Sequence, residues 1–431
     1  MITKRPKGTQ DILPEDSYKW RFLENFLFRQ ASLYGFDEIR TPVFEHTELF
    51  LRSVGEGTDV VEKEMYTFED KGKRSITLRP EGTAGTVRAV VENGIYNRGL
   101  PQKLSYLVNC YRYEKPQTGR YREFNQFGLE IFGAESAAAD AEMIAVACSI
   151  FKKLNVSDLE LQINTIGCPE CRKKYYEALL AYFEKHKENL CPTCIDRLET
   201  RPMRILDCKD PGCQEISKDA PIILDYLCDD CKEHFETLKE YLHAYKINYM
   251  INPRIVRGLD YYTRTVFEFV SNSIGAQGTV CGGGRYNGLV SEIGGPEMQC
   301  VGFGMGIERL ILLLDSQKKI KVSKDECDIY VGSIGEKGRL KAIEIAERLR
   351  EHAFRVEVDI SDKGIKPQMK FANRINAGFS MIIGDNEISN KSIKVKNMRT
   401  GTETEFPLSN YFVDEFVEYF EEVAIQMAGE N

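Results

Sequence analysis

The sequence predicts an α+β fold, in which helices pack on an antiparallel sheet and a smaller α/β domain follows. Three observations lead to this fold class. Strand-like segments before residue 316 succeed one another as hairpins instead of alternating regularly with helices. Eight of the 13 cysteines fall between residues 168 and 231, in a mainly helical stretch that interrupts the strands. Beyond residue 326, strands and helices alternate at the spacing of a small α/β domain.

The spacing of apolar residues predicts the elements of the first part of the chain. Helices are predicted at 17–34, 82–92 and 138–154, and strands at 38–44, 74–80, 103–113, 122–133 and 159–167. A polar, basic segment joins the third and fourth of these strands, which predicts a β-hairpin with a long tip. After the cysteine-rich stretch, strands are predicted at 254–270 and 279–289, and a glycine-rich strand runs into an apolar helix at 301–314.

A polar, basic linker at 316–326 precedes the α/β pattern. Strands are predicted at 328–331, 355–360, 380–383 and 393–396, and helices at 337–352, at 367–376 and from Asn410 onward. Residues 361–400 hold eight Lys and Arg against three Asp and Glu, whereas 401–431 hold eight acids and no base. This asymmetry indicates either ordinary solvated surfaces or a nucleic-acid footprint on one side of the domain.

The chain has 431 residues, and at about 150 residues per domain it is expected to form two or three domains. The changes in composition divide it into a first domain made of 1–167 and 246–322, an inserted domain at 168–245, and a last domain at 325–431.

Composition and charge exclude several classes of protein. There is no run of about 18 apolar residues that would form a transmembrane helix. The first residues lack the apolar core of a secretory signal. A net charge of −8 argues against a protein that coats nucleic acid over its whole surface. These features predict a cytoplasmic enzyme with no membrane attachment.

The predicted hairpin concentrates groups that suit a phosphate-bearing ligand. Arg122, Gln126 and Glu130 lie four residues apart, so they share one face of a strand. Arg112 and Arg120 lie on the other strand and on the tip. Guanidinium groups on a rigid strand bind phosphate well, although by themselves they also fit an ordinary surface hairpin.

Two further segments are harder to explain as ordinary solvent-exposed segments. Arg257, Asp260, Tyr261, Tyr262 and Arg264 fall within eight positions, and such groups are costly to bury without partners. CGGGRYNGL (281–289) has three successive glycines, which allow a ligand close to the backbone. The segment 302–309 then brings an arginine to a helix start. None of these segments matches a P-loop or a dinucleotide-binding fingerprint, nor the HExxH or GxSxG motif.

Together these segments resemble the histidyl-tRNA synthetases, which are class II aminoacyl-tRNA synthetases. TPVFEHTELF (41–50), Cys110–Gly133 and GFGMGIERL (302–310) resemble the three motifs that class II enzymes share. RGLDYYTRTVFE (257–268) and GGGRYNGL (282–289) resemble the two histidine-specific signatures, except that Asn287 stands where aspartate is more usual. TLRPEGT (77–83) resembles the amino-acid loop. The resemblance covers nearly the whole chain and implies a class II catalytic domain with an antiparallel sheet, the inserted domain, and a C-terminal anticodon-binding domain.

The resemblance implies a histidine–tRNA ligase that uses ATP with Mg²⁺, and it assigns roles to residues. Arg112 would hold the α-phosphate, Arg120 and Arg309 the outer phosphates, and Arg257 would supply positive charge at the reacting phosphate. The residues implied to bind histidine are Glu81, Gly82, Thr83, Gln126, Glu130, Tyr261 and Tyr262. Within this set, Glu81, Thr83 and Gln126 would receive the α-amino group, and Glu130 and Tyr262 would read the two imidazole nitrogens. A site with fixed partners for both nitrogens rejects isosteres that lack one.

The implied partners are histidine tRNA, L-histidine and a second copy of the chain in a homodimer. The main alternative is a catalytically silent paralogue that serves as the histidine-sensing regulatory subunit of ATP phosphoribosyltransferase. Such proteins typically lack the anticodon-binding domain and lose the arginine signatures. A weaker alternative is a sensor that binds uncharged tRNA without chemistry. This chain keeps Arg112, Arg257, Arg309 and the C-terminal domain, which favours the enzyme.

The cysteines of the insertion form a separate question. Cys168 and Cys171, followed by Cys191 and Cys194, have the spacing of a zinc ribbon. Four more could form a second set of ligands, with His234 as a spare: Cys208, Cys213, Cys228 and Cys231. Structural zinc is therefore predicted, and free thiols remain the alternative, because the family's insertion does not generally need metal. The isolated Cys110, Cys148, Cys281, Cys300 and Cys327 are expected to be small core residues.

Overall fold

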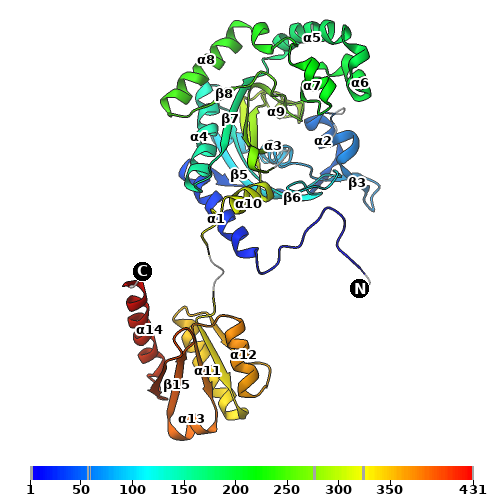
Figure 1. Ribbon diagram of the computed structural model, residues 1–431. Helices are drawn as coiled ribbons and strands as arrows, with labels where there is room; N and C mark the ends of the chain where they lie inside the picture. Colours follow the sequence, from blue (N-terminus) through cyan, green and yellow to red (C-terminus); the bar gives the residue numbers. More distant parts are fainter. Residues whose placement is uncertain (1–2, 56–57, 59, 275–277, 323–325, 430–431) are drawn as a thin grey trace. The chain divides into compact units, whose positions relative to one another are not determined.

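Two units make up the chain, Met1–Val322 and Ser323–Asn431 (Figure 1). The computed structural model describes residues 3–55, 58, 60–274, 278–322 and 326–429. The centre of the predicted linker, 323–325, lies outside the described residues. Within the part of the chain that is described, none of the helices is both long and apolar enough to cross a lipid bilayer.

An eight-stranded sheet forms the centre of the first unit. Its strands, in order across the sheet, are β1 (Asp37–Glu38), β5 (Gln102–Tyr111), β6 (Glu123–Phe132), β11 (Cys300–Gly306), β10 (Thr279–Arg285), β9 (Thr263–Ser271), β7 (Leu159–Thr165) and β8 (Met250–Ile251). Neighbouring strands run antiparallel except at the two edges, where β1 pairs with β5 and β8 with β7 in parallel. The predicted hairpin is β5 with β6, which pair over ten residues each.

Helices α1 (Ser17–Leu33), α4 (Ala137–Lys153) and α10 (Ile307–Ser316) pack on one face of this sheet. Each presents apolar residues at helical spacing, such as Leu23 and Leu27 of α1, which are buried. Helix α4 begins at Ser136, whose side chain accepts a hydrogen bond from the backbone of Ala138 at 3.2 Å. The large core beneath these helices holds the strands that carry the site in one fixed register.

A three-stranded sheet and short helices complete the catalytic half. The sheet has the order β2 (Phe44–His46), β4 (Ser75–Leu78) and β3 (Tyr66–Glu69). The helical segments are α2 (Thr47–Val54), η1 (Val60–Glu64), α3 (Thr83–Glu92), η2 (Ile95–Arg98), η6 (Asn272–Ile274) and α9 (Leu289–Glu292). The single strand predicted at 38–44 is wrong, because β1 and β2 belong to different sheets. Pro42, which lacks a backbone N–H donor, lies in the break.

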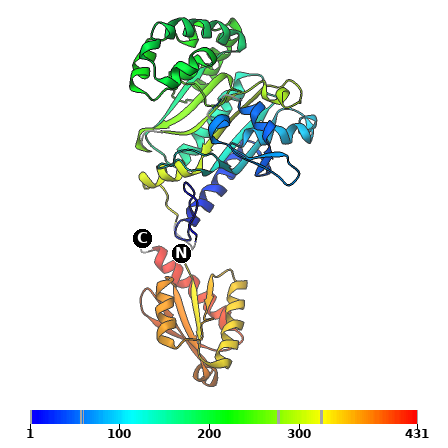
Figure 2. The ribbon, with the colours of Figure 1, turned by 90° about the vertical axis from the view of Figure 1, so that its right-hand side faces the viewer.

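The insertion is helical, as predicted. Its elements are α5 (Pro169–Glu184), η3 (Lys187–Asn189), α6 (Pro192–Thr200), η4 (Pro202–Asp207), α7 (Pro211–Ser217), η5 (Ile223–Tyr226) and α8 (Asp229–Ala244). Figures 1 and 2 show them gathered at one end of the first unit. The helix α8 also packs on the sheet core through Phe235, Leu238 and Leu242.

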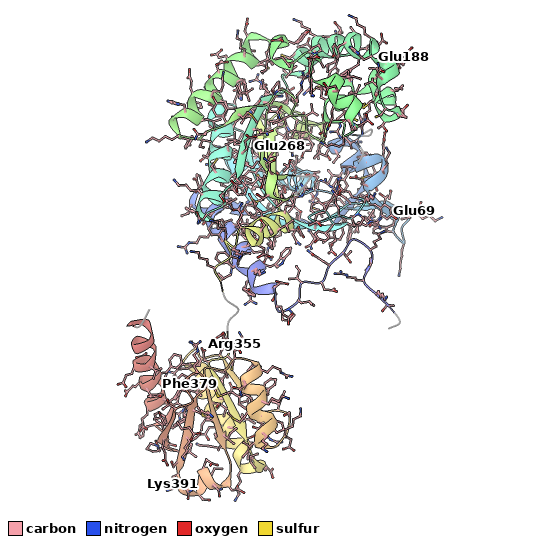
Figure 3. The ribbon with its side chains drawn as sticks, viewed as in Figure 1. Glu69, Glu188, Glu268, Arg355, Phe379 and Lys391 are labelled. Carbon is pink, nitrogen blue, oxygen red and sulfur yellow. The ribbon has the colours of Figure 1, made fainter. Side chains whose placement is uncertain are left out.

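The second unit has a five-stranded sheet in the order β13 (Val356–Val358), β12 (Ile329–Ser333), β14 (Phe379–Ile383), β15 (Ser392–Asn397) and β16 (Glu403–Pro407). Its helices are α11 (Gly335–Glu351), α12 (Ile365–Arg374), α13 (Asp385–Asn390) and α14 (Phe412–Gly429). Phe379, labelled in Figure 3, packs against the rings of Phe416 and Phe420 of α14. The sequence did not predict β16, which pairs antiparallel with β15.

The strand predicted at 254–270 begins only at Thr263. Residues 254–262 have no regular secondary structure. Their polar groups made this stretch stand out in the sequence, and in the fold they line a site instead of pairing in the sheet. The segment Arg257–Tyr262 is called the catalytic loop below.

Candidate active site

A cavity of about 190 Å³ lies on the sheet beside the tip of the β5–β6 hairpin and the start of α10. We call it the arginine cavity. It brings together five residues singled out in the sequence: Arg112, Arg120, Gln126, Arg257 and Arg309. They come from four separate segments, namely the hairpin strands, the hairpin tip, the catalytic loop and helix α10.

The arginines are held in place by main-chain oxygens. The Arg309 side chain donates from Nε to the Gly119 carbonyl at 3.1 Å and from Nη1 to the Thr279 carbonyl at 2.7 Å. The Arg112 Nε donates to the Pro80 carbonyl at 2.8 Å. These contacts fix the direction of both guanidinium groups, which line the cavity.

The cavity is strongly cationic. Burial, together with the neighbouring charges of Arg120 and Arg112, lowers the pKa of Arg309. Burial and the charge of Arg112 likewise outweigh the attraction of Glu64 and lower the pKa of Arg120. The buried carboxylate of Glu114 pairs with Arg120 and neutralises part of this charge. Like charges held together out of water favour the binding of a multivalent anion.

Arg257 lies against the same cavity. Its guanidinium forms an ion pair with Glu268 and lies 5.4 Å from the ring centre of Tyr262. Glu268, labelled in Figure 3, is half-buried and accepts a second hydrogen bond from the Thr279 hydroxyl at 3.0 Å. The arginine is therefore oriented from two sides.

Next to the cavity, Glu130 is the centre of a buried polar cluster. Its carboxylate accepts hydrogen bonds from the hydroxyls of Thr83 at 2.8 Å, Tyr106 at 3.0 Å and Tyr286 at 2.5 Å. Only 1% of the Glu130 surface is exposed, and this burial raises its pKa to about 8. A carboxylate on fixed donors can accept an N–H group of a small polar ligand.

The amino-acid loop predicted at 77–83 closes this cluster. Glu81 accepts from the backbone N–H groups of Thr83 and Ala84, both at 2.7 Å, at the start of α3. Gln126 accepts from the Gly82 N–H at 2.8 Å. Because Gln126 also lines the arginine cavity, the cavity and the Glu130 cluster adjoin.

Three glycines make room for functional side chains. A Cβ atom on Gly302 would collide with the Glu130 carboxylate, and one on Gly304 with the Gln126 amide. A Cβ atom on Gly282 would meet the Arg257 guanidinium. The glycine-rich strands β10 and β11 thus form a floor on which these side chains lie.

Tyr261 and Tyr262 complete the cluster. Both are buried, and their ring centres are 4.6 Å apart. The Tyr261 ring also lies 5.6 Å from that of Tyr286. The tyrosine hydroxyls that donate to Glu130 belong to Tyr106 and Tyr286, two partners that were not predicted from the sequence. Tyr286 follows the three glycines and could have been found, whereas Tyr106 lies in an unremarkable apolar strand.

Two other residues of the signatures lie elsewhere. Arg285 is fully buried and pairs with Asp140, so it holds β10 to α4 and is not exposed to a ligand. The Arg264 side chain lies 3.4 Å from Nδ1 of His234 in the insertion. The carboxylate of Glu308, in contrast, lines the arginine cavity and accepts from the Asn125 N–H at 2.8 Å.

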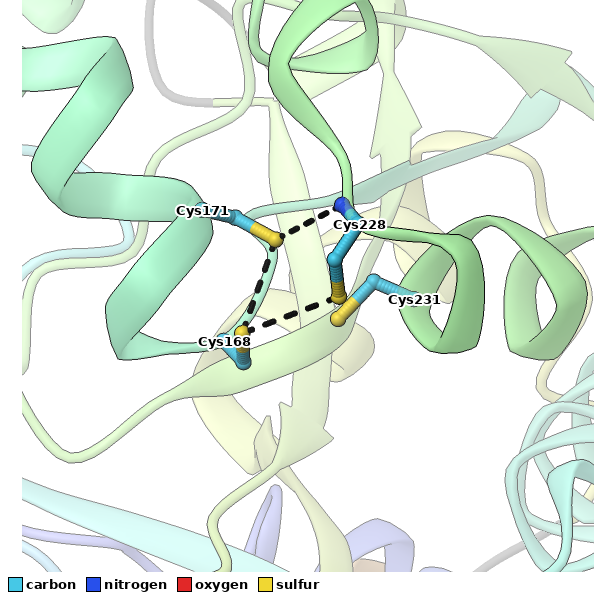
Figure 4. A group of neighbouring side chains, drawn as sticks. All are labelled: Cys168, Cys171, Cys228 and Cys231. Carbon is cyan, nitrogen blue, oxygen red and sulfur yellow. Dashed lines mark hydrogen bonds between the residues drawn. The ribbon is translucent and has the colours of Figure 1, made fainter.

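The eight cysteines of the insertion form two groups of four, but the pairing predicted from their order is wrong. The first tetrad is Cys168, Cys171, Cys228 and Cys231, and the second tetrad is Cys191, Cys194, Cys208 and Cys213. The last Cys-x2-Cys pair returns to the first because α8 leaves the insertion where α5 enters it (Figure 4). His234 belongs to neither tetrad, and its Nε2 lies 3.3 Å from Asp140.

Known proteins are similar to this chain in both sequence and fold. The family model described as histidyl-tRNA synthetase matches residues 8–173 and 214–310. The model described as anticodon binding domain matches residues 328–422. The stretch of the insertion between the two matched parts of the first model includes the second tetrad.

The similarity to individual relatives is nearly full length. The chain is 54% identical over 406 residues to the histidine–tRNA ligase of Caldanaerobacter subterraneus subsp. tengcongensis, covering 94% of this chain and 97% of that one. It is 55% identical over 411 residues to the histidine–tRNA ligase of Clostridium novyi, covering 95% and 98%. The crystal structure of apo S. aureus histidyl-tRNA synthetase matches with a TM-score of 0.80 and 42% identity, over 96% of this chain and all of that one.

Proposed function

The chain belongs to the histidyl-tRNA synthetase family, and from this premise we propose how its residues carry out the reaction. It is a histidine–tRNA ligase with a class II catalytic domain. The enzyme joins L-histidine to AMP at the expense of ATP and then transfers the histidyl group to the 3′ end of histidine tRNA. The relatives reported above do not support the regulatory-subunit alternative, because this chain matches histidine–tRNA ligases over nearly their whole length.

The arginine cavity is the proposed ATP site. Arg112 holds the α-phosphate, and Arg120 and Arg309 hold the outer phosphates. The support for this is that burial and the neighbouring guanidinium charges lower the pKa of Arg309 and of Arg120, a cost that a bound triphosphate would relieve. Mg²⁺ accompanies ATP and prefers carboxylate and phosphate oxygens. Two carboxylates line the cavity, and since Glu114 is paired with Arg120, Glu308 would hold the ion. When bound, the ion would neutralise phosphate charge.

The Glu130 cluster is the proposed histidine site. Glu81, the backbone at Gly82, Thr83 and Gln126 surround the α-amino group. Glu130 accepts one imidazole N–H, and Tyr262, with Tyr261 beside it, serves the other ring nitrogen. The support is the position of this cluster beside the arginine cavity, to which Gln126 connects it. A histidine bound there would direct its carboxylate towards the phosphates.

Arg257 is the proposed catalytic cation, together with Arg112. An oxygen of the histidine carboxylate attacks the α-phosphorus, the P–O bond to the β-phosphate breaks, and pyrophosphate leaves. Negative charge grows on the α-phosphate oxygens, where a pre-oriented guanidinium stabilises the transition state. In the second step the terminal ribose hydroxyl of the tRNA attacks the histidyl carbonyl and AMP leaves. Neither step needs a covalent intermediate on the protein.

The observation that carries this proposal is that four arginines and the Glu130 cluster adjoin on one sheet. We expect histidine-dependent exchange of labelled pyrophosphate into ATP, and no exchange with the other amino acids. The measurement is the exchange rate with each amino acid supplied separately. Exchange with none of them would contradict the assigned chemistry and would favour the regulatory-subunit alternative.

We further propose the domain division 1–167 with 246–322, 168–245 and 325–431. The enzyme is proposed to be a cytoplasmic homodimer that joins through the first class II motif, where Val43 and Phe44 leave apolar surface exposed. Zinc is the proposed structural metal of the insertion, without a part in the chemistry. Analytical ultracentrifugation at the enzyme concentrations used for assays should give the mass of a dimer.

The second unit is the proposed anticodon reader. Removing 325–431 should leave the first unit folded, because each apolar core cluster among the described residues belongs to one unit alone. Pyrophosphate exchange should then largely survive, while tRNA affinity falls. Filter binding and exchange, measured on the same preparation, check the two parts. Intact aminoacylation after truncation would exclude this unit as the reader.

Charge reversal refines the same prediction. Lys363 and Lys370 line a cavity of about 790 Å³ in the second unit, so Lys→Glu changes there should weaken tRNA binding and reduce its salt dependence. Lys394 and Lys396 are the comparison pair, because they lie outside the lining of this cavity and opposite Glu405 and Glu403 on β16. Equal losses in both pairs would contradict a specific role for the cavity.

A further inference from the structure

The geometry of both cysteine tetrads fits a single tetrahedral metal ion. In each tetrad all four sulfur atoms lie within 4.8 Å of one another, and none of the cysteines is in a disulfide. The sulfur of Cys168 lies 3.5 Å from that of Cys171 and 3.9 Å from that of Cys228 (Figure 4). In the second tetrad, the sulfurs of Cys191 and Cys208 are 3.8 Å apart. Zn–S bonds of about 2.3 Å in a tetrahedron place the sulfurs roughly 3.8 Å apart.

The surroundings of the sulfurs also suit metal-bound thiolates. The Cys228 backbone N–H donates to the Cys171 sulfur at 3.1 Å, and the Cys191 N–H donates to the Cys213 sulfur at 3.2 Å. The Asp210 N–H points to the Cys208 sulfur at 3.4 Å. Backbone donors to thiolate sulfur are the kind of surrounding contact that orients metal ligands. Free thiols buried in an apolar core would not need such donors.

The insertion that carries the tetrads also holds the catalytic loop. Arg204 Nη1 donates to the carbonyl oxygen of Arg257 at 2.9 Å. Arg172 Nη1 donates to the carbonyl oxygen of Tyr262 at 2.8 Å. Since the loop has no regular secondary structure, these two contacts secure its first and last residues.

A third arginine and one backbone junction strengthen the connection. Arg201 pairs with Asp260 in the middle of the loop, at 3.3 Å. Immediately after the loop, the Arg264 N–H and the Thr263 hydroxyl both donate to the Gly167 carbonyl, at 3.0 and 3.1 Å. Gly167 directly precedes Cys168, so the first tetrad is joined to this junction through one peptide bond.

Each arginine is placed by a tetrad. Arg172 follows Cys171 directly on the first turn of α5. Arg201 and Arg204 lie in the segment between Cys194 and Cys208, which the second tetrad closes into a loop. The short helix η4 packs on the core through Met203, Ile205 and Leu206, and a metal cross-link at Cys208 would add a second constraint at its end.

We infer that the two tetrads are zinc sites which fix Arg172, Arg201 and Arg204 as positioning residues for the catalytic loop. Zinc would take no part in the chemistry, and its loss would let the loop carrying Arg257 and Tyr262 move. This inference rests on the proposed role of that loop in histidine activation, but the metal sites themselves do not depend on it. Histidine activation in this chain would then depend on bound zinc.

The first test is metal content of the full-length protein by inductively coupled plasma mass spectrometry. We expect about two zinc ions per chain, since each tetrad supplies a complete ligand set. The double variant Cys171→Ser with Cys231→Ser, and the double variant Cys194→Ser with Cys213→Ser, should each lose one ion. Cys148→Ser is the matched control, because this cysteine lies outside both tetrads, and it should keep both ions. Protein that is free of zinc, or that carries iron instead, would overturn the metal assignment.

The second test is a double-mutant cycle on histidine-dependent pyrophosphate exchange. Arg204→Ala should keep both zinc ions and lower kcat/KM for histidine by about tenfold or more, as the loss of a charged hydrogen bond commonly does. Disrupting the second tetrad should produce a similar loss. Combining the two changes should add little, because both act on the same contact. Additive losses would show that the tetrad acts through general stability and would overturn the positioning role.

Controls separate the remaining outcomes. Lys209→Ala changes an exposed charge next to the second tetrad and should alter neither metal content nor kinetics. If the tetrad variants do not fold, zinc can be removed from the wild-type protein with a chelator and then restored, and activity should fall and return with it. Activity that is indifferent to zinc removal would overturn the coupling. Zinc-loaded wild-type protein that exchanges with no amino acid would contradict the proposed function and leave the metal sites standing.

Discussion

Replacing Arg257 with alanine is expected to lower the rate constant of histidyl-adenylate formation by about 100- to 1,000-fold, equivalent to roughly 3–4 kcal/mol. The guanidinium lines the arginine cavity and is oriented by Glu268 and the Tyr262 ring. Its charge is therefore in place before the reaction begins and is worth most when charge develops on the phosphate. Histidine affinity should change much less, because the imidazole contacts lie on Glu130.

Single-turnover kinetics with excess enzyme, together with equilibrium histidine binding, separate these two effects. Arg264→Ala is a matched control, since it removes an arginine from the same signature while its side chain lies towards His234. It should retain most of the adenylation rate. Near-normal adenylation by the Arg257→Ala enzyme would remove this residue from the mechanism.

The change Glu130→Gln should weaken histidine binding by roughly 10- to 100-fold, because hydrogen bonds to a charged group are worth about 1.5–3 kcal/mol. Glutamine has nearly the same shape but only one oxygen, so either the Tyr286 hydroxyl or the hydroxyls of Thr83 and Tyr106 would face an amide NH2 group instead of an acceptor. ATP binding should stay close to normal, because the arginine cavity is unchanged. Calorimetric titration with each substrate checks this, and equal losses for both would indicate misfolding instead.

Glu130 also predicts how histidine affinity varies with pH. Burial raises the pKa of Glu130 to about 8, so the free enzyme holds much of this carboxyl in its protonated form at neutral pH. Binding of an imidazole N–H favours the ionised form, and affinity should therefore rise with pH and level off above about pH 8. In Glu130→Gln this rise should disappear. Both proteins share the titrations of histidine itself, so the difference between the two profiles isolates Glu130.

The same pKa has a consequence for stability. Between the ordinary carboxyl pKa and about 8, the folded protein binds more protons at Glu130 than the unfolded chain does. The contribution of this group to the free energy of unfolding therefore decreases as pH rises through that interval. Ionised Glu130 therefore lowers the free energy of unfolding, and groups with such shifted pKa values are common in functional sites.

Most of the first unit could be predicted from local patterns. The hairpin β5–β6 and helices α1, α3 and α4 begin and end within two residues of the predicted positions. The errors fall where local patterns conflict with the fold. The stretch 38–44 was divided between two sheets, 254–262 serves the site instead of the sheet, and β16 was missed because its sequence, ETEFP, is short and acidic.

The sequence by itself determined which chemical groups the protein has and roughly where along the chain they lie. Arg112, Arg257 and Arg309 could be identified from short segments that resemble the motifs of a known family, because each such motif is a continuous run of residues. Only the tertiary structure decided which groups meet. Tyr106 and Tyr286 reach Glu130 because β5, β6, β11 and β10 are neighbours in the sheet, and Cys228 joins Cys168 because α8 returns to the start of α5. Such contacts depend on strand order and helix packing, which bring distant residues together regardless of their separation in the chain.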